Sequence, residues 1–153
     1  MNNYIYAGGI LAAVMLLAAW RPWRGRRQEQ MRSRGRQAFP LRREWLEARF
    51  LTLASESGKP RGLVWVDCDF DNRVSFAKDR QSGHLRALVG VTIRFEAEEG
   101  GGMEDNPNVG NLRAATAVFE FDGREWNTQG RAIFNLDPDQ AIEHFQAELE
   151  TAE

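Results

Sequence analysis

The pattern of apolar and polar positions changes twice along the chain, and each pattern predicts a different kind of element. The first 20 residues carry no charged side chain, so residues 1–23 predict a transmembrane helix that crosses a bilayer core of about 30 Å. Residues 24–38 show no apolar periodicity and are rich in arginine, which predicts a flexible basic linker. In residues 39–150 apolar positions recur with helical and strand periods, which predicts one α+β domain.

Aromatic and basic residues flank the uncharged run, and Pro22 is expected to end its helix. The residues expected at the membrane interfaces are Tyr4, Tyr6, Trp20, Arg21, Trp23, Arg24, Arg26 and Arg27. Because the arginines follow the run, the positive-inside rule predicts an N-terminus outside the cell membrane and a cytoplasmic C-terminal domain. The alternative is a cleaved secretory signal, which requires a basic residue before the apolar run and a small-residue cleavage site after it; neither is clear.

Two helices are predicted in the domain. Apolar residues recur at spacings of three and four over residues 41–57, and Gly58 ends this long amphipathic helix. The second helix is short: Asp137 is its expected N-cap, Pro138 its first residue, and Gln140 the return partner of a capping box.

Alternating apolar positions between these helices predict five strands. The strands are expected at residues 62–70, 73–77, 86–97, 113–121 and 124–134. Asp71-Asn72 and Asp122-Gly123 are expected to form hairpin turns, and Gly130 predicts a bulge. The predicted fold is a five-stranded, mainly antiparallel curved sheet, with the long and the short helix packed on one face. In element order it resembles the cystatin-like and NTF2-like folds, and this resemblance implies no activity and no site residue.

The formal net charge of −2 hides two opposed blocks. Residues 21–43 hold nine arginines and one acid, for a net charge of +8, whereas residues 44–153 hold 11 bases and 21 acids, for a net charge of −10. The basic block predicts contact with the bilayer and its anionic headgroups. Nucleic acid is the alternative partner of clustered arginines, but the acidic domain would repel a polyanion, so no nucleic-acid partner is predicted.

Three aspartates on one predicted strand are the candidate metal ligands. Asp67, Asp69 and Asp71 recur at every second position, so their carboxylates could surround a hard cation such as Ca²⁺. The calcium-loop pattern fails, because Asn72 stands where glycine is needed and Lys78 where a glutamate is needed. The alternative is a solvated strand end, so the presence of a metal stays open.

The remaining candidate residues are a cysteine, two histidines and two tryptophans. Cys68 is the only cysteine, and it is interpreted as a small buried hydrophobic residue; a dyad with His84 or His144 is the alternative. Trp65 and Trp126 lie on predicted strands, either in the core or lining a pocket in the concave side of the sheet.

No catalytic residue and no cofactor site is predicted. The predicted function is that of a single-pass membrane-anchored protein whose cytoplasmic α+β domain is a binding or interaction module with an unidentified protein partner. One alternative is a small-ligand-binding protein or enzyme with a pocket between the curved sheet and the first helix. Another is a subunit of a membrane protein assembly. The sequence leaves the oligomeric state open.

Overall fold

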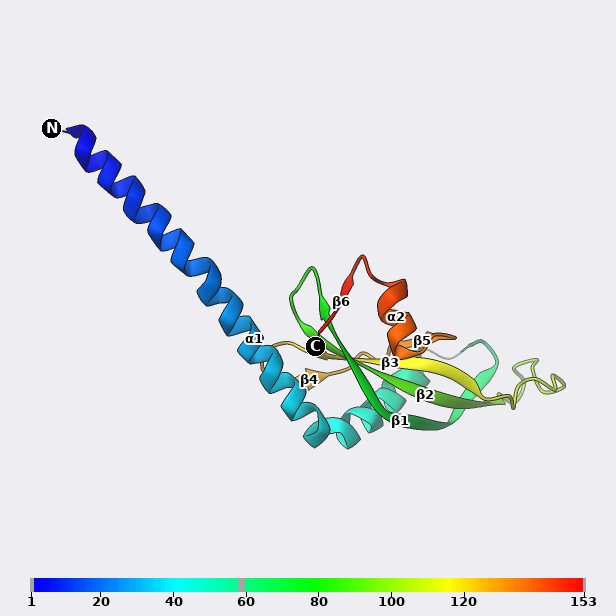
Figure 1. The fold of residues 1–153 in the computed structure, drawn as a ribbon. Helices are drawn as coiled ribbons and strands as arrows, with labels where there is room; N and C mark the ends of the chain where they lie inside the picture. The colour runs from blue at the N-terminus through cyan, green and yellow to red at the C-terminus, as the bar shows by residue number, and fades with distance from the viewer. Residues whose placement is uncertain (1, 58–59, 153) are drawn as a thin grey trace.

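The computed structural model describes residues 2–57 and 60–152, and it has the predicted α+β class, with two helices and a curved antiparallel sheet. Helix α1 spans Asn2–Ser57 and helix α2 spans Pro138–His144. The strands are β1 (Leu63–Asp79), β2 (Leu85–Ala97), β3 (Arg113–Phe121), β4 (Trp126–Asn127), β5 (Ala132–Phe134) and β6 (Leu149–Thr151). The N-terminal part of α1 extends away from the sheet, and its C-terminal part lies along one side of it (Figure 1).

Helix α1 is continuous where an end at Pro22 and a flexible linker over residues 24–38 were predicted. The linker is helical because arginine, glutamine and glutamate favour helix, and because Glu29 accepts hydrogen bonds from two arginines farther along the helix. One side of its last turns packs on the sheet: Gly35 is buried, and its carbonyl accepts a hydrogen bond of 2.8 Å from Trp126 Nε1. Figure 1 shows α1 bending in its cyan part, which contains Pro40, a residue that removes one helical hydrogen bond.

Most side chains of the predicted membrane anchor lie outside the described part of the chain. The interface residues that lie there are Tyr4, Tyr6, Trp20, Arg21 and Arg24. Trp23, Arg26 and Arg27 are described and exposed, and the Arg27 guanidinium lies 5.3 Å from the Trp23 ring centroid. Within the described residues, no helix combines the length and the apolar character needed to cross a membrane.

The sheet has six strands in the order β4-β3-β2-β1-β6, with β5 also paired to β3, and every pair is antiparallel. The hairpin predicted at Asp71-Asn72 is wrong, because β1 continues through it as one long strand. Residues 71–73 bulge opposite the single residue Gly90 of β2, and pairing resumes on both sides. Because β1 pairs with a long partner strand, the residues that are typical of a turn form a bulge instead.

A second irregularity in β1 corrects the predicted alternation of its side chains. The register shifts between Trp65 and Asp67, so one extra residue lies on β1 at this point. Cys68 and Phe70 therefore pack against the same core as Trp65, although the regular alternation placed them on the opposite face. A shift of one residue moves all following side chains to the other face of a sheet.

The two helices cover opposite faces of the sheet, not the single face that was predicted. The face toward α1, here called the α1 face, holds a large aromatic core. The opposite face, the α2 face, holds a smaller cluster formed by Ala77, Leu88, Ala141, Ile142 and Leu149. Figure 1 places α2 and the C-terminal part of α1 on opposite sides of the sheet.

The start of α2 is formed as predicted. Asp137 is the N-cap, and its side chain accepts a hydrogen bond of 2.9 Å from Gln140 N. In return, Asp137 N donates a hydrogen bond of 3.1 Å to Gln140 Oε1, which completes the capping box. Pro138 lies in the first turn, where its missing N–H costs no hydrogen bond.

Candidate functional site

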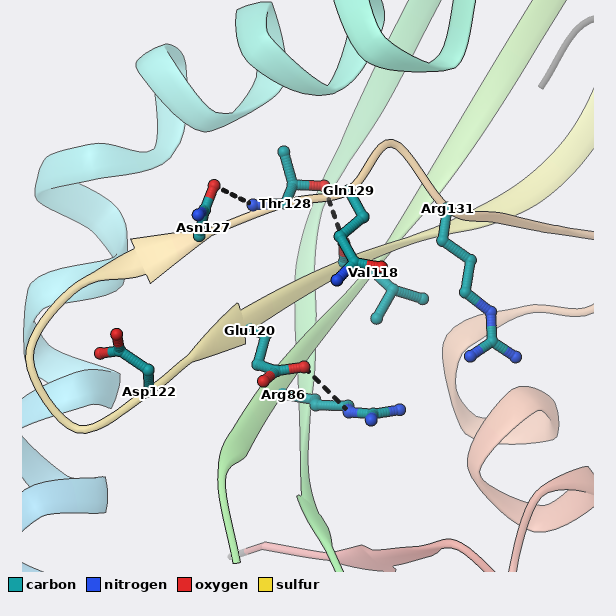
Figure 2. Close-up of a pocket in the computed structure, with 8 residues that line it drawn as sticks. All are labelled: Arg86, Val118, Glu120, Asp122, Asn127, Thr128, Gln129 and Arg131. Atoms are coloured by element: carbon teal, nitrogen blue, oxygen red, sulfur yellow. Dashed lines mark hydrogen bonds and ion pairs between the residues drawn. The ribbon is translucent and has the colours of Figure 1, made fainter. Parts of the chain in front are cut away.

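A polar cavity of about 190 Å³ lies beside β3, where the chain leaves the sheet between β4 and β5 (Figure 2). We call it the polar pocket. Its lining residues are Arg86, Val118, Glu120, Asp122, Asn127, Thr128, Gln129 and Arg131. Val118 and Glu120 alternate along β3 with residues of the aromatic core, so the polar pocket opens on the α2 face.

Between Gln129 and Arg131, two residues that line the polar pocket, the chain arches away from β3 (Figure 2). At the top of this arch Gly130 has a φ of 72°, and a Cβ atom there would lie 2.6 Å from the backbone nitrogen of Ala54 in α1. Only glycine combines this left-handed conformation with such a close approach. Where a bulge was predicted at Gly130, the structure has a break in the pairing: residues 128–131 separate β4 from β5 and divide the predicted strand 124–134 in two.

Hydrogen bonds connect both ends of the arch to β3. Thr128 Oγ1 donates to the Val118 carbonyl at 3.0 Å, and Gly130 N donates to Thr128 Oγ1 at 3.1 Å. On the other side, Val118 N donates to the Arg131 carbonyl at 3.1 Å. The side chains of Gln129 and Arg131 are therefore carried by a backbone that is fixed at both ends.

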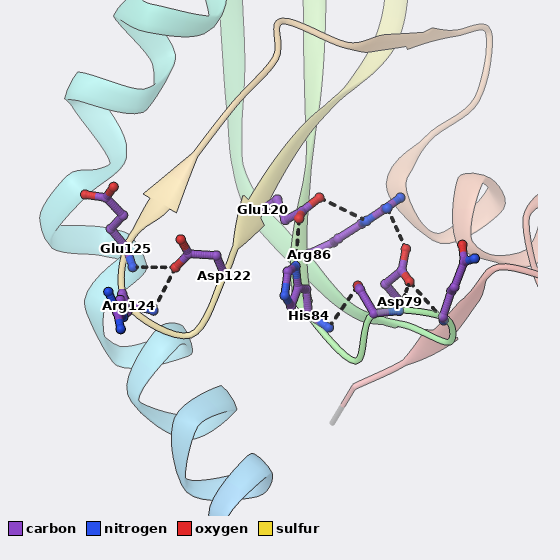
Figure 3. Close-up of polar contacts among 9 residues, drawn as sticks. Asp79, His84, Arg86, Glu120, Asp122, Arg124 and Glu125 are labelled. Carbon is purple, nitrogen blue, oxygen red and sulfur yellow. Dashed lines mark hydrogen bonds and ion pairs between the residues drawn. The ribbon is translucent and has the colours of Figure 1, made fainter.

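A charged network supports the inner wall of the polar pocket (Figure 3). Arg86 Nη2 lies 2.5 Å from Asp79 Oδ2, and Arg86 Nε lies 3.8 Å from Glu120 Oε2. His84 Nδ1 lies 2.8 Å from the other Glu120 oxygen, Oε1. Asp79, His84, Arg86 and Glu120 thus form one chain of contacts, which we call the charged network.

Hydrogen bonds keep two carboxylates of this region ionised. The Ser82 backbone N–H lowers the pKa of Asp79 against the opposing effect of burial, and the nearby Arg86 lowers it further. The Glu125 and Arg124 backbone N–H groups lower the pKa of Asp122, whose Oδ1 accepts both hydrogen bonds. Both groups therefore carry negative charge at neutral pH.

The Arg131 guanidinium keeps free hydrogen-bonding capacity, whereas the unpartnered nitrogen of Arg86 is buried. Arg86 Nε is buried and has no hydrogen-bond partner, since 3.8 Å to Glu120 is too long for a hydrogen bond. The Arg131 guanidinium lies 5.3 Å from the Phe145 ring centroid and has no carboxylate partner within the described residues. Arg131, which is exposed, can therefore donate strong hydrogen bonds to a bound molecule.

The predicted aspartate site is not assembled in the structure. Asp67 lies 3.6 Å from Arg94, and Asp71 lies in the bulge of β1, where its Oδ1 accepts a hydrogen bond of 3.4 Å from Arg73 N. Across residues 2–57 and 60–152, no group of three or more His, Cys, Asp or Glu residues could hold a metal ion. Asp69 and Asp71 instead line a wider hollow of about 810 Å³ that reaches the start of α2.

The cysteine and the tryptophans belong to the packing of the domain. Burial raises the pKa of Cys68 to about 12, helped by the charges of Asp67 and Asp69, so its thiol is protonated and is a poor nucleophile. Trp65 and Trp126 are 7% and 4% exposed and pack in the core between α1 and the sheet. The space in which a ligand pocket was expected is therefore occupied by side chains.

Sequence reasoning did not bring the four residues of the charged network together, and His84 was considered only as a partner of Cys68. Arg86 and Glu120 lie at polar positions of two strands, and each taken alone is typical of a solvated residue. In the structure they are direct cross-strand neighbours of β2 and β3. The register between these strands was the missing information, since opposite charges facing each other across two strands stabilise a sheet.

No protein family model, no curated protein and no solved structure matches this chain.

Proposed function

We propose that this chain is a single-pass membrane-anchored protein whose α+β domain is a binding module, with the polar pocket as its binding site. The observation that carries the proposal is the cavity under the arch, where ionised groups of both signs line one concave site. The alternative pocket between α1 and the sheet has no support, because the aromatic core occupies that space.

The membrane anchor in this proposal rests on the sequence. The uncharged first 20 residues are followed by nine arginines in residues 21–43, an order that favours an N-terminus outside and a cytoplasmic domain. The continuous α1 supports this arrangement, because one helix then joins the anchor to the domain. Exposed arginines such as Arg26 and Arg27 would each gain about 1 kcal/mol from anionic headgroups.

Site-specific photo-crosslinking in the native membrane tests the binding site. A photoreactive amino acid at Gln129, on the rim of the polar pocket, is expected to form a covalent adduct with the bound molecule. The same group at the exposed Leu112 is the matched control and should form none. The mass of the adduct separates a small ligand from a protein partner, and absence of any adduct at position 129 contradicts the proposal.

Carbonate extraction of membranes tests the anchor separately. The full chain should stay with the membrane pellet, and the double substitution Leu11→Arg with Val14→Arg should release it, because arginine is costly in a bilayer core. The control, Arg26→Gln with Arg27→Gln, keeps the apolar run and should stay in the pellet. Release of the unchanged chain would refute the anchor.

An exposed pair on α1 supports a second candidate function, that of a subunit in a membrane assembly. Leu41 and Trp45 are 86% and 51% exposed and lie one helical turn apart. The Arg49 guanidinium lies 5.4 Å from the Trp45 ring centroid. A photoreactive group at position 41 should then give a protein-sized adduct, and a chain that runs as a monomer without adducts would exclude this function.

A further inference from the structure

The charges that line the polar pocket are separated along its length. Figure 2 shows Asp122 at one end and Arg131 at the other, with Glu120, Arg86 and Val118 between them. This separation matters because a bound charge is stabilised by the opposite charge and destabilised by a like charge.

The acidic end has oxygen atoms that are free to accept hydrogen bonds. Asp122 Oδ1 accepts from the backbone of Arg124 and Glu125, whereas no hydrogen bond to Oδ2 is present within the described residues. Glu120 Oε1 is engaged with His84, but Oε2 has only the long contact with Arg86. A cationic group placed here would meet two carboxylates that the protein's own cations do not saturate.

The basic end is complementary to an anion. Arg131 has no carboxylate partner among the described residues, and it lies at the end of the pocket away from Asp122. A guanidinium group binds a carboxylate through two parallel hydrogen bonds, which gives orientation as well as affinity. The anionic group of a ligand is therefore expected at Arg131.

We infer that the polar pocket binds a small zwitterion of about amino-acid size, with its carboxylate at Arg131 and its ammonium group at Asp122 and Glu120. This inference rests on the proposed function and names the ligand class of the same site. A simple anion would pair only with Arg131, and a simple cation would pair only with Asp122 and Glu120. The volume of about 190 Å³ is below that of most sites for drug-sized molecules, which begin at roughly 300 Å³.

The uncharged lining fits the same class of ligand. Val118 lies on the floor between the two charged ends and offers an apolar contact for methylene groups that separate an ammonium from a carboxylate. The side-chain amides of Asn127 and Gln129 lie on the rim, where they can complete the hydrogen bonds of either end group. Zwitterions with a short methylene chain are therefore expected to bind better than glycine.

Calorimetric titration of the full chain in detergent micelles tests the ligand class. The probes are glycine, γ-aminobutyrate and 6-aminohexanoate, together with butyrate and butylammonium, which carry only one of the two charges. At least one zwitterion should bind about tenfold more tightly than either single-charge probe, because it gains an ion pair at both ends. Equal binding of butyrate or butylammonium overturns the inference, and so does the absence of binding by every zwitterion at millimolar concentration.

Two pocket variants and one control locate the binding. Arg131→Gln and Asp122→Asn should each weaken binding of the best zwitterion by about tenfold, and Arg94→Gln, outside the pocket, should leave it unchanged. Saturation-transfer NMR on the unchanged protein decides the question if a variant does not fold. Zwitterion binding that persists in both folded pocket variants overturns the inference.

The two proposals can fail separately. If a crosslinked adduct forms at position 129 but no zwitterion binds, the proposed ligand class is wrong and the proposed binding site is still supported. Failure of both experiments removes both.

Discussion

The two faces of the sheet differ in what fills them. On the α1 face, Phe39, Phe50 and Phe119 are fully buried, and their rings meet at centroid distances of 5.6 and 5.9 Å. On the α2 face the apolar cluster is small, and beside it lie the charged network and the polar pocket. Aromatic contacts of this kind bury a large area and exclude water, whereas the groups of the α2 face keep charge and hydrogen-bonding capacity.

The difference indicates that the α1 face contributes mainly to stability and the α2 face mainly to binding. Arg131 has no carboxylate partner among the described residues, but it is exposed, so its guanidinium can be hydrated and costs the fold little. Gly130 connects the two faces, because its backbone touches α1 while its neighbours cover the pocket. Substitutions on the α1 face should therefore change mainly stability, and those around the pocket mainly binding.

The largest effect is expected on the α1 face. Phe50→Ala removes a fully buried ring that contacts Trp65, Phe70 and Phe119, and it should lower the free energy of unfolding by about 3–5 kcal/mol. Urea unfolding of the full chain in mild detergent measures the change. Leu41→Ala, at an exposed position of the same helix, is the control and should stay within about 0.5 kcal/mol. Similar losses in both variants would break the comparison.

The second-largest effect is expected at Gly130, which connects the α1 face and the α2 face of the sheet. Gly130→Ala places a Cβ 2.6 Å from Ala54 N and imposes a φ of 72° on alanine, so it should cost about 1–3 kcal/mol and also weaken binding in the pocket. Gly110→Ala is the control, because a Cβ there meets no atom within 4 Å. Unfolding and zwitterion titration are measured on both variants. A loss of stability without a loss of binding would show that the arch does not shape the pocket.

The same contrast explains what could be predicted from the sequence. The capping box of α2 was predicted correctly because it depends on Asp137 and Gln140, which are three positions apart. An irregularity at Gly130 was also predicted, since a glycine inside a strand often marks a bulge or a close approach of another backbone, and the pairing with β3 is interrupted there. The hairpin at Asp71-Asn72 was wrong because turn residues also suit a bulge, and only pairing with β2 decides between them.

The polar pocket could not be predicted for a related reason. It requires the cross-strand pair Arg86 and Glu120 and the approach of Gly130 to α1, and none of these contacts is local in sequence. The continuity of α1 was missed because the proline rule was applied at Pro22 without the helix-forming residues that follow it. Trp65 and Trp126 were placed on the correct strands, but their burial depended on how closely α1 packs.

The third effect is a pH dependence that comes from the α2 face. Asp79 has a lowered pKa in the folded protein, so its contribution is complete above its unfolded pKa of about 3.9 and is lost as the pH falls through the folded value. Asp79→Asn should cost about 1 kcal/mol at pH 7, and this difference should shrink as the pH falls below about 4. Urea unfolding at a series of pH values measures it.

The exposed Asp67 offers the control for this pH dependence. Asp67→Asn removes only the long contact with Arg94, so its effect on the free energy of unfolding should stay below about 0.5 kcal/mol at pH 7. A difference between wild type and Asp79→Asn that is the same at pH 7 and at low pH would mean that the charge of Asp79 does not support the charged network.

The smallest change in the free energy of unfolding is expected at an exposed ion pair on the α2 face. Arg73 Nη2 lies 2.5 Å from Asp139 Oδ2 and joins β1 to α2, but about two thirds of each side chain is accessible to solvent, at 66% and 64%. Water and salt screen such a pair, so Arg73→Gln should change the free energy of unfolding by only about 0.2–1 kcal/mol. The difference should vanish in about 1 M salt, where the screening length is near 3 Å.

Ser75→Ala is the companion variant. Ser75 donates a hydrogen bond of 2.7 Å to Asp139 Oδ1 and carries no charge, so the effect of this substitution should not depend on salt. A loss at Arg73 as large as the loss at Phe50 would mean that α2 is as important for stability as the aromatic core, and the division between the two faces would then be wrong.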